Sequence, residues 1–256
     1  MGMANAVFIV GMAGSGKSAL TGAYLDWLRA SDQDAISINL DPGATALPYN
    51  PDIDSRNYVD IEKLMLDYQL GPNGALIMAT DLLADHLEEI RDEIEAANPN
   101  LVLVDTPGQM ELFAFREGGR FIAKELTDDD CGLIYLMDAP FTRSPSNFIS
   151  NIYLAAAVHS RVMHPQVYAL SKIDLVSEHE VDRILTWTTE PETLEMSLQA
   201  MEDQNLSMIV RDLANAVFAA GLISEPIAVS AKDRSGLVEL NATVTRALTR
   251  GEEPST

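Results

Sequence analysis

A glycine-rich loop near the N-terminus limits what this chain can fold into more than any other feature. Residues 11–18 read Gly-Met-Ala-Gly-Ser-Gly-Lys-Ser and directly follow a short apolar segment at residues 6–10. They fit G-x-x-x-x-G-K-[S/T], a loop whose glycines let successive backbone N–H groups face one point. Apolar side chains then recur at helical spacing, at Leu20, Tyr24, Leu25 and Leu28. A strand, this loop and a helix in that order predict a nucleotide phosphate site rather than a simple glycine turn.

Two residues of the loop have side chains with expected roles of their own. Lys17 is predicted to reach the β- and γ-phosphates, and the Ser18 hydroxyl is predicted to hold Mg²⁺. The neighbouring positions are expected to supply backbone N–H groups, which act together with the positive end of the helix dipole. These positions are Gly11, Ala13, Gly14, Ser15, Gly16 and Ala19.

Short apolar segments recur along the chain and alternate with amphipathic stretches. The segments predicted as buried strands are residues 6–10, 35–40, 101–104, 132–137, 167–170 and 227–229. One amphipathic stretch is predicted as a helix ending before Pro99, with an apolar face formed by Leu83, Leu87, Ile90 and Ile94. This alternation predicts a doubly wound α/β fold with a mainly parallel sheet and a site at the carboxyl ends of its strands.

The chain is long enough for one α/β domain, which we expect to cover residues 1–250, with a disordered tail at residues 251–256. Residues 177–221 lie between two of the later strands and are predicted to form a helical insertion that stops at Gly221. Most of its large apolar residues are expected in the core rather than on a surface for a partner. These are Trp187, Met196, Met201 and Met208.

Composition narrows the functional classes. The formal net charge of −22 argues against non-specific binding to nucleic acid or to anionic lipid. No apolar run approaches the ~20 residues that span a bilayer, and residues 6–10 are too short for a signal-peptide core. We therefore expect a cytoplasmic protein without a membrane segment. The single cysteine, Cys131, heads an apolar strand and is interpreted as a buried, inert thiol.

A second phosphate-side motif follows the strand at residues 101–104, where the chain reads Asp105-Thr-Pro-Gly108-Gln109. A carboxylate that ends a buried strand beside a phosphate loop typically reaches Mg²⁺, which is the role predicted for Asp105. Gly108 is expected to offer its N–H to the γ-phosphate, and Gln109 to orient an attacking water. The alternative is a turn in which Asp105 caps the helix that starts near Met110. Earlier in the chain, Asp41 follows another strand and is predicted to contact a water of the metal or to polarise the attacking water. The alternative is a simple Asp-Pro turn.

Two further motifs concern the base. Residues 171–174, Ser-Lys-Ile-Asp, resemble the guanine-reading N/T-K-x-D element, in which Asp174 accepts from the ring N–H and amino group of guanine while Lys172 lies along the base. Residues 230–232, Ser-Ala-Lys, are expected to bring a backbone N–H to the guanine oxygen; the set is Ser230, Ala231 and Lys232. Both motifs end strands, which favours GTP over ATP. Ser171 departs from the usual Asn or Thr, and we expect it to weaken the support of the phosphate loop.

Taken in order, these motifs resemble those of one family, the GPN-loop GTPases, a branch of the dimeric GTPases and ATPases built on the P-loop NTPase fold. The distinguishing tripeptide is Gly71-Pro72-Asn73, in an insertion at about residues 58–80. The resemblance also covers residues 39–42, 47–49 and 105–111, and so extends over nearly the whole chain.

The resemblance implies a homodimer in which this loop, with Gly71, Pro72 and the catalytic Asn73, reaches the phosphate site of the partner. It also implies that Asp41, Gln109 and Glu111 arrange the hydrolytic water. Eukaryotic members of the family are linked to RNA polymerase assembly, so the resemblance implies a client protein or complex. The four histidines form no pattern of metal ligands, which argues against a nickel-delivery role.

Together the motifs predict a Mg²⁺-dependent homodimeric switch that binds and hydrolyses GTP. No local motif marks an arginine finger, so either dimer contacts or a monovalent cation would supply the remaining positive charge. Two alternatives are a P-loop kinase acting on a small acceptor and a nucleotide-gated scaffold with negligible turnover. Gln109 and Glu111 argue against the scaffold.

Overall fold

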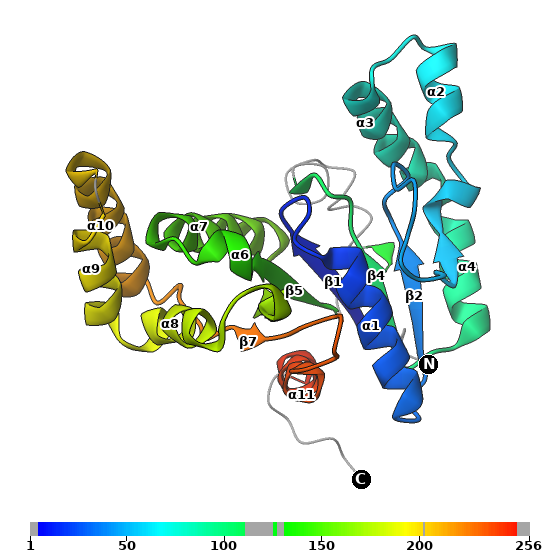
Figure 1. Ribbon diagram of the computed structural model, residues 1–256. Helices are drawn as coiled ribbons and strands as arrows, with labels where there is room; N and C mark the ends of the chain where they lie inside the picture. Colours follow the sequence, from blue (N-terminus) through cyan, green and yellow to red (C-terminus); the bar gives the residue numbers. More distant parts are fainter. Residues whose placement is uncertain (1–4, 111–124, 127–130, 202, 250–256) are drawn as a thin grey trace.

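A single parallel sheet forms the centre of the structure, a computed structural model that describes residues 5–110, 125–126, 131–201 and 203–249 (Figure 1). Within these ranges the sheet has seven strands in the order β3-β2-β4-β1-β5-β6-β7, and all neighbouring strands are parallel. The strands are β1 (Asn5–Gly11), β2 (Ala35–Asn39), β3 (Ile53–Asp54), β4 (Leu101–Asp105), β5 (Cys131–Asp138), β6 (Gln166–Ser171) and β7 (Ile227–Ala228). The predicted doubly wound α/β fold with its parallel sheet is confirmed.

Helices surround this sheet. The α-helices of the described residues are α1 (Lys17–Ala30), α2 (Ile61–Asp67), α3 (Pro72–Leu83), α4 (Leu87–Ala97), α6 (Ala139–Thr142), α7 (Pro145–Val162), α8 (Glu178–Thr189), α9 (Pro191–Gln199), α10 (Gln204–Ala219) and α11 (Leu237–Leu248). Short 3-10 turns are η1 (Ser55–Asn57), η2 (Ala84–His86) and η4 (Ile173–Leu175). In these ranges no helix combines the length and the apolar character needed to cross a bilayer.

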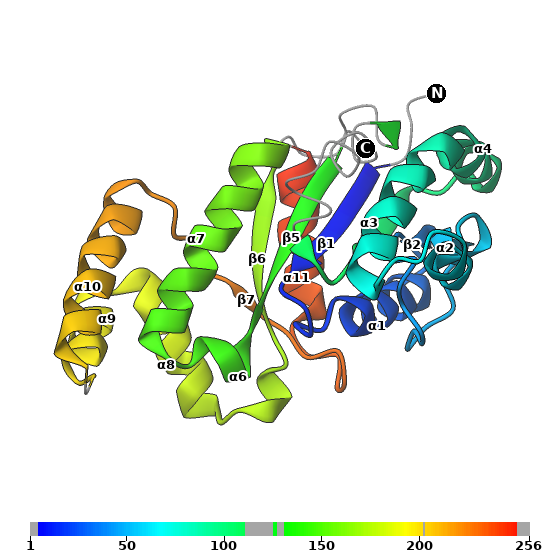
Figure 2. The same cartoon turned by 90° about the horizontal axis from the view of Figure 1, so that it is seen from above.

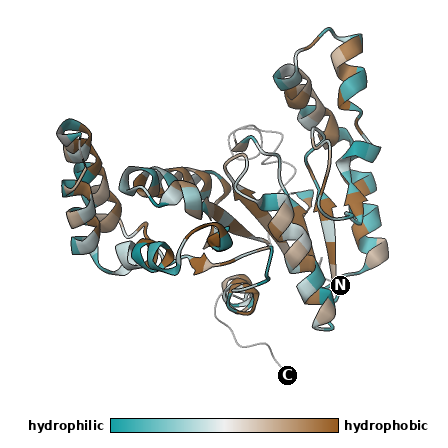
Figure 3. Ribbon diagram, viewed as in Figure 1, coloured by the Kyte–Doolittle hydropathy of each residue, from teal (hydrophilic) through white to brown (hydrophobic). Residues whose placement is uncertain are grey.

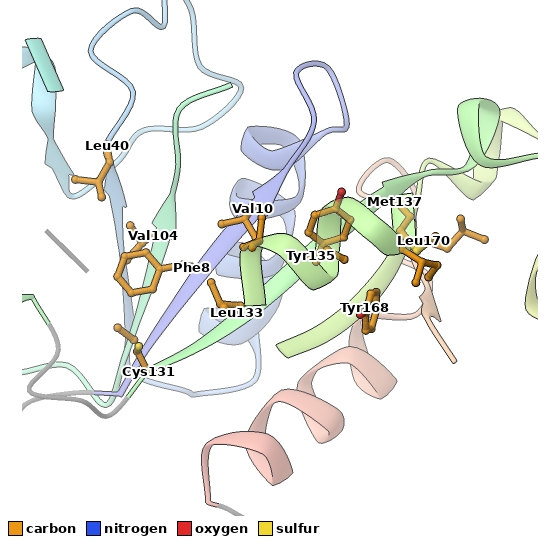
Figure 4. Close-up of a cluster of buried hydrophobic side chains, with 14 of the residues drawn as sticks. Phe8, Val10, Leu40, Val104, Cys131, Leu133, Tyr135, Met137, Tyr168 and Leu170 are labelled. Carbon is orange, nitrogen blue, oxygen red and sulfur yellow. The ribbon is translucent and has the colours of Figure 1, made fainter. Parts of the chain in front are cut away.

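The sheet has an apolar core on each face because successive side chains of a strand point to opposite sides. On one face, Phe8 and Val10 of β1 pack among buried residues of the neighbouring strands (Figure 4). Buried residues of α3, α4 and α7 belong to the same cluster. On the other face, Val7 and Ile9 pack against α1 and α11. Figure 3 shows mostly hydrophobic colours on the central strands, whereas the surrounding helices carry hydrophobic and hydrophilic stretches side by side. Cys131 is buried in the first of these cores, as predicted.

Two groups of helices extend from opposite ends of the sheet (Figures 1 and 2). The hairpin of α2 and α3 lies on the β2 and β3 side of the sheet, where α3 also packs on its face, and α8, α9 and α10 lie on the β7 side. α10 ends just before Gly221, whose φ of 65° continues the chain in the left-handed region, as the sequence predicted.

Three details differ from the predictions. β3 was not anticipated, because two residues are too few to give a periodic pattern. The helix predicted through Leu83 and Ile94 is divided by the turn η2, which keeps both apolar faces turned to the core. Of the four large apolar residues expected mostly in the core of residues 177–221, Trp187 is buried, whereas Met196 and Met208 are each 63% exposed.

Candidate functional site

The glycine-rich loop joins the central strand β1 to α1 at the carboxyl edge of the sheet (Figure 1). Gly14 and Gly16 have φ values of 76° and 96°, a region that side-chain-bearing residues rarely adopt. Gly16 is also the N-cap of α1, so the positive end of that helix faces the loop. The loop therefore has the backbone geometry that the phosphate-binding motif requires.

Lys17 lies beneath this loop and is 5% exposed. Its ammonium group donates to the carbonyl oxygens of Gly11 and Met12, each at 3.1 Å. Burial lowers the pKa of Lys17, while the charges of Asp105 and Asp41 act in the opposite direction. The lysine is thus held inside the loop, with two carboxylates close enough to favour its charged form.

Asp105 ends β4 next to the loop and is 1% exposed. Its Oδ2 accepts a hydrogen bond from the Tyr49 hydroxyl at 3.2 Å, whereas its Oδ1 is buried without a hydrogen-bond partner. Burial raises the pKa of Asp105 to about 6, and the nearby Ser18 hydroxyl and Lys17 ammonium counteract that rise. Burial, followed by the Asp105 charge, raises the pKa of Tyr49, so its hydroxyl stays a donor.

The residues around Asp105 fit a hard divalent cation. A buried carboxylate oxygen without a partner is costly unless a cation or donor satisfies it. Asp105 Oδ1 is such an atom, and the Ser18 hydroxyl is close enough to influence the same carboxylate. Oxygen donors of these types are those that Mg²⁺ selects in proteins. Asp105 and Ser18 therefore fit the metal role that the sequence predicts for them.

The segment after β2 brings Asp41 to the same edge. The buried Asn39 accepts a hydrogen bond from the Asp41 N–H at 3.0 Å and donates to the Asp41 carbonyl at 3.2 Å, which fixes the turn. Asp41 Oδ2 in turn accepts from the backbone N–H of Gly108 at 3.3 Å. Gly108 itself lies against the phosphate loop, since a Cβ on it would lie 3.8 Å from the Cβ of Ala13.

Gln109 and Asn73 are brought together although 36 positions separate them. The Gln109 amide donates to Asn73 Oδ1 at 3.1 Å, and both side chains are exposed. Asn73 lies in the first turn of α3, which begins at Pro72 with Gly71 as its N-cap. This contact joins residues of one chain, and the role of Asn73 across a dimer interface stays a prediction. Glu111, the third residue predicted to arrange water, lies outside the described residues.

Lys172 crosses from the end of β6 to the phosphate loop. Its ammonium group forms an ion pair with Asp138 at 2.6 Å and also donates to the carbonyl of Gly14. A Cβ on Gly16 would lie 3.5 Å from the Lys172 Cε, so the side chain passes directly over the loop. The lysine side chain thus lies against the phosphate loop, and its position along a base stays a prediction.

The other base-reading residues are linked by hydrogen bonds. Ser230 donates to Asp174 Oδ1 at 2.9 Å, and the backbone N–H of Lys232 donates to Ser230 Oγ at 3.2 Å. A cavity of about 660 Å³ brings both motifs together with the end of the phosphate loop. The residues of the predicted site that line it are Gly16, Ala19, Ser171, Lys172, Asp174, Ala231 and Lys232.

Ser171 forms a hydrogen bond with the phosphate loop. Its hydroxyl donates to the carbonyl of Ser15 in the phosphate loop at 2.7 Å, with the Met137 carbonyl 3.3 Å away as a second acceptor. The serine is 4% exposed, so water does not compete for this bond. The short side chain thus reaches the loop backbone, and whether it supports the loop less than Asn or Thr would stays a prediction.

The sequence did not assign roles to two residues that the structure places at the site. Asp138 ends β5 and pairs with Lys172, and the signal that identified Asp105, a carboxylate ending a buried strand, was available for it. Tyr49 contacts Asp105 from 56 positions away, and nothing local in the sequence marks such a contact.

Comparisons with known proteins agree on one family. A family profile described as "Conserved hypothetical ATP binding protein" matches residues 9–250. A GPN-loop GTPase of Pyrococcus abyssi is 37% identical over 180 residues, which are 69% of this chain and 71% of that protein. GPN-loop GTPase 1 of Dictyostelium discoideum is 28% identical over 236 residues, 91% of this chain and 59% of that protein.

A solved structure of a Pyrococcus abyssi GTPase in its apo form is also similar. It superposes with a TM-score of 0.83 at 29% identity, covering 96% of this chain and 98% of that one. This chain spans between 51% and 59% of the length of three curated eukaryotic relatives that it matches.

Proposed function

Because the chain belongs to the GPN-loop GTPase family, we propose that it binds GTP together with Mg²⁺ and hydrolyses the nucleotide to GDP and inorganic phosphate. The observation that carries the proposal is the meeting of four groups at one sheet edge. These are the phosphate loop, the buried carboxylate of Asp105, the turn that holds Asp41, and the cavity lined by Lys172 and Asp174. Such an edge is where doubly wound folds bind nucleotides.

The descriptions of the similar proteins differ on the nucleotide: the family profile is described as ATP-binding, while the relatives are called GTPases. The residues of the base site therefore carry the choice between GTP and ATP. The Asp174 carboxylate can accept two hydrogen bonds from guanine, whose ring N–H and amino group lie on one edge. Adenine offers no such pair, so it would leave the carboxylate unsatisfied. The hydrogen bond from Ser230 orients the carboxylate, and the N–H of Ala231, which lines the same cavity, is the donor for the guanine oxygen.

In the proposed reaction, a water molecule attacks the γ-phosphorus in line with the bond to the β-phosphate oxygen. That bond breaks, the β-phosphate keeps the electron pair, and a proton from the water ends on the released phosphate. Lys17 and the loop amides neutralise the charge that develops on the phosphate oxygens. Asp105 and Ser18 would hold Mg²⁺, which supplies further positive charge at the β- and γ-phosphates.

Gln109 orients the attacking water in this proposal, with Asp41 and Glu111 as the acidic groups of the same region. Asp41 accepts the Gly108 N–H, which is also the donor expected for the γ-phosphate. GTP would therefore compete with Asp41 for this N–H, and its arrival frees the carboxylate to accept from water. The remaining positive charge comes from the second subunit of a homodimer or from a monovalent cation.

The proposal also covers the location, the oligomeric state and the partners of the protein in the cell. We place the protein in the cytoplasm as a homodimeric switch that assists the assembly of a protein complex such as RNA polymerase. Capture of partners by GTP-locked and GDP-locked forms from the native cytoplasm tests this role, and identical partner sets for both forms would contradict a switch. Sedimentation of the purified protein tests the homodimer, and a monomer at micromolar concentration with GTP and Mg²⁺ would contradict it.

The central experiment measures binding and turnover together. Calorimetric titration should give far tighter binding for GTP and GDP than for ATP and ADP, and inorganic phosphate should appear when GTP and Mg²⁺ are supplied without an acceptor. Equal affinity for GTP and ATP would overturn the guanine assignment. Phosphate release that requires a small acceptor would favour the kinase alternative, and GTP binding without turnover in a verified dimer would favour the scaffold.

A further inference from the structure

Tyr49 contacts Asp105 at the candidate site and has no role in the proposed hydrolysis. Its segment connects β2 to β3, and Tyr49 lines the cavity together with its neighbours Pro48 and Asn50. The phenol hydroxyl donates to Oδ2 of Asp105 at 3.2 Å, while Oδ1 of the same buried carboxylate has no partner. Tyr49 thus occupies one oxygen of Asp105, while the Ser18 hydroxyl also acts on the same carboxylate.

A close approach in α1 fixes the position of this tyrosine. Gly22 lies on the buried face of the helix, and a Cβ added to it would come within 2.8 Å of the Tyr49 Cβ and 3.3 Å of its Cγ. Glycine within a helix costs about 1 kcal/mol relative to alanine, so the residue weakens α1. What it provides is the space in which the Tyr49 side chain packs against the helix.

We propose that Tyr49 is a positioning residue for the metal ligand Asp105. By occupying Oδ2, its hydroxyl turns the carboxylate so that Oδ1 is the oxygen presented to Mg²⁺, and Gly22 makes room for the tyrosine to do so. This inference rests on the proposed function, since it concerns the Mg²⁺ that accompanies the nucleotide. A carboxylate that is fixed before the cation arrives loses less conformational freedom when it binds.

The proposed role of Tyr49 affects the affinity for Mg²⁺ and leaves the affinity for the nucleotide alone unchanged. Without the hydroxyl, Asp105 can rotate, so the cation is bound more weakly. The contacts of Lys17, Lys172 and Asp174 with the nucleotide itself are untouched. The Tyr49→Phe variant should therefore need about tenfold more Mg²⁺ to reach the tightly bound state, the equivalent of about 1.4 kcal/mol. Its affinity for GDP in the presence of EDTA should match that of the wild type.

The test titrates a fluorescent GDP analogue into the full chain at a series of Mg²⁺ concentrations and in EDTA. Tyr153→Phe is the matched control, because its hydroxyl donates to the Leu213 carbonyl at 3.0 Å, between α7 and α10. An unchanged Mg²⁺ requirement for Tyr49→Phe overturns the inference, as does an equal loss of affinity with and without Mg²⁺. If the wild type itself shows no Mg²⁺ dependence, the metal part of the proposed function fails and this inference fails with it.

A second variant addresses the close contact. Gly22→Ala should displace Tyr49 and raise the Mg²⁺ requirement by a similar factor, and adding Tyr49→Phe to it should have little further effect. Melting temperatures of all variants report whether each one folds. A folded Gly22→Ala protein with the wild-type Mg²⁺ requirement, or additive effects in the double variant, would show that the contact does not place the hydroxyl.

Discussion

At the base end of the site, Ser230 donates to Asp174 and Lys172 is paired with Asp138, whereas at the hydrolysis end Gln109 and Asn73 are both exposed and share one hydrogen bond. Lys172 and Asp174 line a cavity, and the described lining of that cavity includes neither Gln109 nor Asn73. An exposed hydrogen bond is easily exchanged for water, while partly buried networks hold their geometry. Under the proposed function, the groups that read the base are therefore held more firmly than the contact between Gln109 and Asn73.

The largest expected effect concerns the base end of the site. Asp174→Asn replaces a double acceptor with an amide, so GTP affinity should fall on the order of a thousandfold, because each hydrogen bond to a charged group contributes about 1.5–3 kcal/mol. Xanthosine triphosphate, which has a carbonyl where guanine has its amino group, should bind the variant better than GTP. Calorimetry with both nucleotides measures these affinities. Unchanged GTP affinity would show that Asp174 does not bind the base.

The next effect belongs to the hydrolysis end. Gln109→Ala should slow GTP turnover about a hundredfold and leave GTP affinity nearly unchanged, since the lost contact acts on water in the transition state. Phosphate release and calorimetry measure the two quantities. The control is Gln199→Ala, which removes an exposed glutamine that contacts Glu195 on α9. A loss of GTP affinity equal to the loss of turnover would show that Gln109 contributes to nucleotide binding rather than to hydrolysis alone.

A smaller effect is expected for Asn73→Ala, about a tenfold loss of turnover, because the asparagine acts through one hydrogen bond. Mixing decides in which subunit it acts. The wild type is combined with an excess of the Gln109→Ala/Asn73→Ala double variant, and heterodimers are verified. Under the cross-subunit interpretation, activity per wild-type subunit falls; constant activity would assign Asn73 to its own chain, next to Gln109.

The smallest effect concerns the ion pair beside the base. Asp138→Asn should weaken GTP binding about threefold to tenfold, because Lys172 loses the charged partner that holds it over the phosphate loop. Turnover of saturating GTP should change little. Glu195→Gln is the control, since it removes an exposed partner of Arg211 at 3.8 Å, far from the site. Equal affinity for the two variants would show that Lys172 keeps its place without Asp138.

The sequence was sufficient for the features that local patterns encode. Strand β1, the loop and α1 follow from an apolar run, three glycines and a helical repeat. Asp105 follows from a carboxylate at a strand end, and Asp174 from the resemblance of residues 171–174 to the guanine-reading element. The contact between Tyr49 and Asp105 could not be predicted this way, because it depends on how a long connection folds back onto α1. Nor does helical periodicity say what covers a face, so Met196 and Met208 were expected in the core and lie at the surface.

The order of the strands has a consequence for how the chain folds. β1, which leads into the phosphate loop, pairs with β4 and β5: Ala6 is matched with Val102 and with Cys131, which lie 96 and 125 positions further along the chain. Parallel pairing over such separations carries a large loop-closure entropy and forms slowly. During synthesis, a nascent chain that ends before Cys131 already contains the entire nucleotide-binding loop but lacks one of the two strands that flank β1.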